Sequence, residues 1–193
     1  MNLNERTLAP QLEEFLQILC GEFDNSQQLR QLESQGVEGY PHARHVNTDC
    51  TGAITGLPED FAGAFVLEES YYTQKGRTNP MPHLFLFTYE DGQVKLTSYE
   101  IPEGYTKETF RADNLSPIPA ASLEVSEKFT PAWYKKEGDA WVGGSESWFT
   151  PVMKFTLFER FSPQVLEVTE TIEVNGKRTF GYDLPLEYRR AAK

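Results

Sequence analysis

The sequence predicts a mainly β domain, an antiparallel up-and-down β-barrel preceded by one α-helix. Apolar residues recur at helical spacing near the N-terminus, before about residue 20. From Gly63 onward they alternate with polar residues, and turn signals separate the alternating runs at intervals of about ten residues. So many strands in one domain would leave exposed edges unless the sheet closed on itself. We therefore expect a closed barrel.

The first element is an amphipathic helix, expected over about residues 5–20. Pro10 is tolerated in the first turn because the nitrogen there needs no hydrogen-bond partner. Gly21 is a suitable stop, since glycine readily adopts the left-handed conformation at a helix end. The apolar stripe consists of Leu8, Leu12, Phe15, Leu16 and Leu19.

Strands follow in hairpin order. The sequence predicts them at residues 63–73, 83–89, 93–101, 133–135, 140–142, 153–161, 165–174 and 177–184. Glu90-Asp91-Gly92 and Asn175-Gly176 have the composition of tight hairpin turns. The irregular stretches at residues 35–60 and 104–131 are expected to be loops or lids around the barrel ends. The 193 residues then form one domain, with the barrel over about residues 21–190.

Composition excludes several classes of protein. There are 29 acidic and 18 basic residues, and the resulting net charge of −11 argues against a nucleic-acid partner. No stretch approaches the roughly 18 apolar residues of a membrane span, and the polar N-terminus lacks the apolar core of a signal peptide. We therefore expect a cytoplasmic protein. Cys20 and Cys50 form no C-x-x-C pair, and His42 and His45 lack zinc-finger spacing, so we expect no metal site.

Aromatic residues make up 13% of the chain, a high share, and many fall in the alternating runs. Such rings either fill a barrel or line a cavity for a flat apolar ligand. The sequence contains no nucleophile elbow, P-loop or dinucleotide-binding motif that would indicate a particular reaction.

Glu68 and Glu69 lie in the middle of a predicted strand, so alternation directs one into the barrel and the other to solvent. An inward carboxylate is costly unless it meets a donor. Two interpretations are equally open: a buried ion pair with Arg44 or Arg160, or a contact with ligand N–H groups.

His42 and Arg44 are two residues apart and would share one face of an extended stretch. That face would suit a ligand carboxylate, although a solvated surface pair is the more common arrangement. Tyr71, Tyr72 and Tyr99 would either stack on a conjugated ligand or fill the core.

The order of several short motifs resembles the CpcT/CpeT family of phycobiliprotein chromophore lyases. The resemblance runs through most of the chain and is densest over residues 12–101. The matching pieces are Gly21-Glu22-Phe23-Asp24-Asn25-Ser26-Gln27-Gln28, His42-Ala43-Arg44, Leu67-Glu68-Glu69-Ser70-Tyr71, Ser98-Tyr99-Glu100-Ile101 and Trp141-Val142-Gly143.

The resemblance implies a calycin-like (lipocalin-related) barrel that binds a phycobilin and attaches it to a cysteine of a phycobiliprotein subunit. The bilin is then the ligand and no separate cofactor is implied. By position, His42 and Arg44 would contact the propionates and Glu68, the expected catalytic residue, the pyrrole N–H groups. Tyr71 and Tyr99 would contact the ring faces.

The chain departs from this family at two places. The family usually carries a P-Y-R-x-R strand, whereas Leu84 and Leu86 stand here at the arginine positions. A Gly-Cys pair is also missing near Trp133. Two alternatives to a lyase follow: a non-enzymatic barrel that binds another small apolar ligand, or a filled barrel that binds a protein partner, including a second copy through a sheet face.

Overall fold

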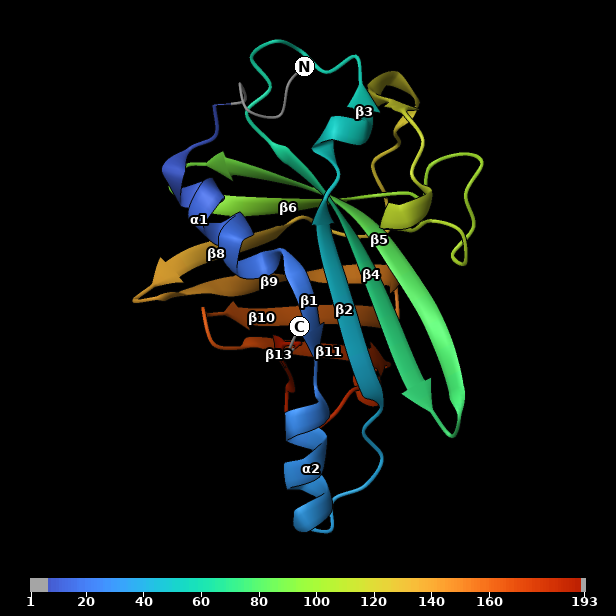
Figure 1. Ribbon diagram of the computed structural model, residues 1–193. Coiled ribbons are helices and arrows are strands. Elements are labelled where there is room, and N and C mark those ends of the chain that lie inside the picture. Colours follow the sequence, from blue (N-terminus) through green and yellow to red (C-terminus); the bar gives the residue numbers. More distant parts are fainter. Residues whose placement is uncertain (1–6, 192–193) are drawn as a thin grey trace.

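The computed structural model describes residues 7–191 and confirms the mainly β class, with ten antiparallel strands closed into a barrel (Figure 1). This architecture is consistent with the calycin (lipocalin-like) barrels. The strands of the ring are β1 (Gly21–Asp24), β2 (His42–Asp49), β4 (Ala64–Gln74), β5 (Arg77–Glu90), β6 (Gln93–Tyr99), β8 (Ala132–Glu137), β9 (Ala140–Thr150), β10 (Met153–Phe161), β11 (Leu166–Val174) and β13 (Leu186–Arg190).

The ring follows the order β10-β9-β8-β6-β5-β4-β2-β1-β13-β11, and β11 pairs with β10 along its whole length to close it. A further strand, β12 (Lys177–Phe180), pairs only with the end of β11. Two of the predicted hairpin turns are confirmed. Asp91-Gly92 and Asn175-Gly176 all have positive φ, as a two-residue type I′ turn requires.

Helix α1 (Pro10–Leu19) covers one end of the barrel. It begins at Pro10, later than expected, because a residue before proline avoids the helical conformation, and Ala9 is extended. Residues 5 and 6 of the expected helix lie outside the described residues. Phe15 is fully buried, and its ring lies 5.2–5.9 Å from four others. The four rings belong to Phe87, Tyr134, Trp141 and Phe161.

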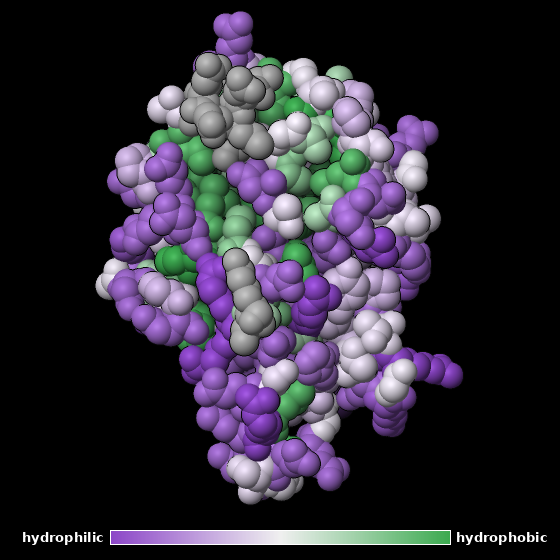
Figure 2. Space-filling view, in the orientation of Figure 1, coloured by the Kyte–Doolittle hydropathy of each residue, from purple (hydrophilic) through white to green (hydrophobic). Residues whose placement is uncertain are grey.

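The sequence did not predict a second helix or several of the strands, β1, β2 and β13 among them. Helix α2 (Ser26–Ser34) lies beyond the barrel, at the largely hydrophilic end of the face shown in Figure 2. Strand β2 falls in the stretch expected to be irregular. Its inward side chains include the buried His45 and Asn47, so no apolar alternation marks it in the sequence. The Asn47 side chain donates to the Leu19 carbonyl and ties β2 to the end of α1.

Residues 35–60 and 104–131 were expected to be loops or lids around the barrel ends; much of both stretches is irregular, as expected, but most of it does not lie at the barrel ends. Residues 50–61 and 101–123 instead cover the outer face of β4 and β5, where they build a second hydrophobic cluster. Within it, β3 (Ile54–Thr55) pairs in parallel with β7 (Ile118–Pro119). Three 3-10 turns flank these strands, at Thr51–Ala53, Ala112–Asn114 and Ala120–Ser122. The buried members of the cluster are Cys50, Ile54, Phe65, Leu67, Leu84, Phe110 and Ile118.

We expect Phe15→Ala to lower the free energy of unfolding by about 3–5 kcal/mol, because it removes the ring on which four others pack. Chemical denaturation measures this. The matched control is Phe158→Ala, since Phe158 is 51% exposed and its loss should cost less than about 1 kcal/mol. Equal losses for the two variants would show that α1 does not seal the barrel.

Candidate functional site

The barrel encloses a cavity of about 570 Å³. Small-molecule sites span roughly 300–1,000 Å³, so the space is large enough for a guest of drug size or somewhat larger. Its walls come from every strand of the ring except β1, together with residues 128–130 and 180–184. The walls are mainly apolar and carry many aromatic rings, which belong to Tyr72, Phe85, Phe87, Phe129, Phe149, Phe155, Phe161, Phe180 and Tyr182.

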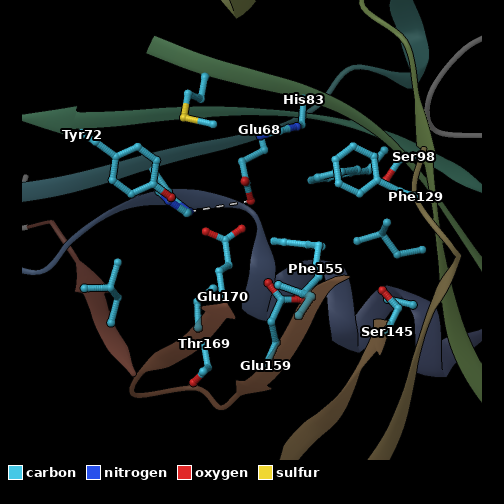
Figure 3. A pocket seen from close by; sticks show the side chains of 18 of the residues that line it. Glu68, Tyr72, His83, Ser98, Phe129, Ser145, Phe155, Glu159, Thr169 and Glu170 are labelled. Atoms are coloured by element: carbon cyan, nitrogen blue, oxygen red, sulfur yellow. Dashed lines mark hydrogen bonds and ion pairs between the residues drawn. The ribbon is translucent and has the colours of Figure 1, made fainter. Parts of the chain in front are cut away.

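Three carboxyl groups point into this aromatic space: Glu68 from β4, Glu159 from β10 and Glu170 from β11 (Figure 3). Each stands where strand alternation demands an inward side chain. For example, Glu159 lies between the inward Leu157 and Phe161. Acidic groups on three separate strands therefore converge on one space.

Burial disfavours the charged forms of these groups. It raises the pKa of Glu159 to about 8 and that of Glu170 to about 7, and it also raises the pKa of Glu68. The neighbouring Glu68 carboxyl adds to the pKa increase at both Glu159 and Glu170. The Tyr134 hydroxyl donates a hydrogen bond to Glu159 and opposes the increase there. Near neutral pH Glu159 and Glu170 are therefore close to their titration points.

Glu68 has polar neighbours but, within residues 7–191, no positively charged partner at physiological pH. Ser70 Oγ donates to Glu68 Oε1 at 3.0 Å, and His45 Nδ1 lies 3.7 Å from Oε2. Burial lowers the pKa of His45 to about 3, so its ring is neutral at physiological pH. Burial likewise lowers the pKa of His83, which lies opposite Glu68 on β5. The Glu68 side chain keeps 18% of its surface exposed, and the residue lines the cavity.

The alternative in which the inward carboxylate pairs with Arg44 or Arg160 is wrong. Arg44 contacts Glu22 at 3.4 Å and Arg160 contacts Glu167 at 3.7 Å. Within residues 7–191, no lysine or arginine forms an ion pair with any of the three inward carboxyl groups. Among the described residues, the three acids therefore have no positively charged partner at physiological pH, since His45 is neutral there.

Of the residues predicted for the site, the structure places Glu68 at the cavity, and Tyr72, one of the three tyrosines considered as ring contacts, also lines it. His42 and Arg44 do share a face of β2, as expected, but it is the exposed outer face, and the Arg44 guanidinium lies 5.4 Å from the Tyr71 ring centroid. Tyr71 donates to Glu69 at 2.6 Å, also outside the barrel. Tyr99 packs edge-on against Phe65 in the second hydrophobic cluster.

The leucines at the family's arginine positions face outward too. Leu84 and Leu86 pack in the second hydrophobic cluster, whereas the inward positions of β5 carry His83, Phe85 and Phe87. An arginine at either leucine position would therefore point away from the barrel interior and would not reach the cavity. The absence of these two arginines removes nothing from the cavity wall.

The cavity residues that went unpredicted include His45, His83, Glu159 and Glu170. A signal existed for three of these four. Glu159, Glu170 and His83 occupy inward positions whose inward neighbours on the same strand are apolar, so a strict application of the alternation would have selected them. His45 carried no such contrast, because the next inward residue, Asn47, is also polar.

No family model and no curated protein matches the chain. None of the helices in the described range, residues 7–191, has the length and apolar character needed to cross a membrane. Across the same range, no group of three or more histidine, cysteine, aspartate or glutamate side chains is arranged to hold a metal ion.

We expect the free energy of unfolding to fall as the pH rises from 6.5 to 8.5. In this window the native state keeps protons on Glu159 and Glu170 that the unfolded chain, with carboxyl pKa values near 4.5, has already released. His45, which is neutral in the native state, has the opposite effect: it makes the free energy of unfolding rise with pH, but only below its unfolded pKa of 6.5. The slope should reach about 1.4 kcal/mol per pH unit for each titrating group.

Denaturation at several pH values measures this slope. Glu159→Gln should flatten it, because the amide has no proton to lose, whereas Glu173→Gln, at a position exposed on the outside of β11, should leave it unchanged. A slope that is the same in all three proteins would mean that Glu159 is already ionised in the native state.

Proposed function

We propose that this chain is a bilin-binding barrel, a lyase or chaperone that holds an open-chain tetrapyrrole and delivers it to a phycobiliprotein subunit. One observation carries the proposal: three carboxyl groups that have no lysine or arginine partner among the described residues face a cavity with many aromatic rings in its wall. Such groups cost free energy unless a guest supplies N–H donors or positive charge. A flat, conjugated guest that is rich in N–H groups meets both requirements.

A bilin matches the cavity in chemistry as well as in size. Its pyrrole nitrogens would donate to Glu68 and Glu170, and its ring faces would pack on Phe85 and Phe155. Protonation of the bilin would add a charge-assisted component to these contacts. The binding roles first given to His42, Arg44, Tyr71 and Tyr99 are not proposed again, because these side chains do not line the cavity.

The attachment step would use a thiol of the acceptor protein. Its sulfur adds to an exocyclic double bond of the bilin, and the thiol proton ends on the neighbouring carbon, so no oxidant or reductant is consumed. The barrel contributes by orienting and protecting the bilin. Glu68, beside the pyrrole nitrogens, would hold the reacting system in place. A cytosolic setting suits this chemistry, since Cys20 and Cys50 are both thiols.

The two alternatives fare differently. A barrel with a filled interior is incompatible with a cavity of about 570 Å³. A non-enzymatic carrier remains as the second candidate, because the proposed nucleophile lies in the acceptor and the barrel could bind the guest without transferring it.

We expect the purified chain to form a coloured complex with phycocyanobilin. Glu68→Gln and Glu170→Gln should each weaken binding by about 10- to 100-fold, the range for loss of one charge-assisted hydrogen bond. Both variants should fold nearly as stably as the parent chain, because the neutral amide avoids the cost of a buried charge.

Absorbance titration measures the binding, and Glu173→Gln is the matched control that should bind like the parent chain. If Glu68→Gln loses as much stability as affinity, then Glu68 is a structural residue. If the parent chain forms no complex with the bilin, the proposed function is wrong.

Lyase activity is tested separately by mixing the bilin complex with an apo-phycobiliprotein β-subunit. We expect a covalent adduct on an acceptor cysteine, detected by denaturing electrophoresis with bilin fluorescence. The adduct should form faster than with free bilin and should disappear when that cysteine is replaced by serine. A complex that binds bilin but does not raise the rate of attachment would identify the chain as a carrier.

A further inference from the structure

The barrel wall is incomplete at one place. β5 pairs with β4 from Arg77 to Phe87 but joins β6 only from Leu84 onward. On the far side, β9 pairs with β8 only as far as Gly144. The first half of β5 and the second half of β9 therefore flank a gap in the ring of hydrogen bonds, and only residues 124–131 run between β6 and β9 there.

Two prolines keep this gap from closing. Pro80 and Pro82 lie in the part of β5 that has no second neighbour, and both belong to an unbroken ladder with β4. A proline is tolerated in a strand where its nitrogen faces away from the partner, because it has no N–H to donate. The open edge of β5 thus lacks two of the donors that another strand would need.

The gap leads to the cavity. Asn79 and Met81 of β5, Phe149 of β9 and the connecting residues Lys128 and Phe129 all line the cavity, and we call these five residues the portal. Met81 occupies an inward position, yet it is 43% exposed. An inward side chain of a closed barrel would be covered, so this exposure indicates that solvent reaches the cavity here.

Positive charge collects on the same side. Lys128 Nζ lies 4.5 Å from the Phe149 ring centroid and 5.5 Å from that of Phe129. Arg77, at the start of β5, also lines the cavity. In the part of the chain that the structure describes, neither Lys128 nor Arg77 forms an ion pair. Within a chain of net charge −11, two unpaired cations therefore border a cavity whose interior holds three acids.

We propose that the portal, together with Arg77 two residues before Asn79, holds the anionic groups of the guest: Lys128 and Arg77 bind its carboxylates while its N–H groups reach the acids inside. The inference rests on the proposed function for the class of guest and adds its orientation. A bilin would lie with its propionates at the gap in the wall and its pyrrole nitrogens turned toward Glu68. The portal then recognises a carboxylate-bearing guest, and a neutral ester would lose these contacts.

Biliverdin and its dimethyl ester test this orientation, because they differ in the carboxylates alone. The parent chain should bind biliverdin at least about tenfold more tightly than the ester, and added salt should reduce this preference. Replacing both Lys128 and Arg77 by methionine keeps much of the apolar stem and should abolish the preference, leaving affinity for the ester unchanged. Lys135→Met, at an exposed position of β8, is the control and should bind like the parent chain.

The outcomes separate the two proposals. Equal affinity of the parent chain for biliverdin and ester, or an equal loss of both in the double variant, would overturn the portal inference and leave bilin binding intact. Binding of neither compound would overturn the proposed function and the inference together. Thermal melting of each variant checks that the fold is retained.

Discussion

The pairing of β10 with β11 turns the ten strands into a ring, and the other properties of the site depend on that closure. Strand pairing around most of the ring satisfies the backbone without water, so the wall shields much of the interior from solvent. Phe15 seals one end with a cluster of rings. In such an enclosure each ionisable group loses its hydration. This is why burial raises the pKa of Glu159 and Glu170 and lowers that of His45.

A barrel selected for stability alone would not keep three acids in this position. Apolar side chains of similar volume would fill the space and avoid the cost of burying charge. Apolar side chains do occupy the neighbouring inward positions: Leu157 and Phe161 flank Glu159, and Val168 and Ile172 flank Glu170. Acids at the inward positions of two apolar strands, together with Glu68 on a third, therefore point to a role in binding rather than in folding. A guest that donates hydrogen bonds to these acids would offset the free-energy cost of burying them.

Most of the fold could be predicted from the sequence because the patterns that indicate it are local. Turn chemistry at Asp91-Gly92 and Asn175-Gly176 and alternation along β10 and β11 identify hairpins without knowledge of distant contacts. Strand β2 was missed because its inward residues, His45 and Asn47, are polar and their burial depends on packing against α1 and Tyr188. The second hydrophobic cluster was missed for the same reason, as contacts between residues 50–61 and 101–123 are long-range. Within the site, alternation could supply Glu68, Glu159 and Glu170, but it could not decide which face of the polar strand β2 points inward.

The residues expected to bind carboxylates show most clearly that membership of a motif does not determine where a side chain lies in the fold. His42 and Arg44 belong to the stretch that resembles a bilin lyase, yet they lie on the outer face. The cations that reach the cavity, Lys128 and Arg77, lie in segments that no motif covers. The fold explains the difference: the pairing of β5 with β6 reaches only Leu84, and the gap beside Pro80 and Pro82 makes the wall near Lys128 the place where a charged group can meet both solvent and cavity. A guest that satisfies the acids inside and the cations at this gap must be elongated, with donors on one side, carboxylates on the other and an apolar ring system between them.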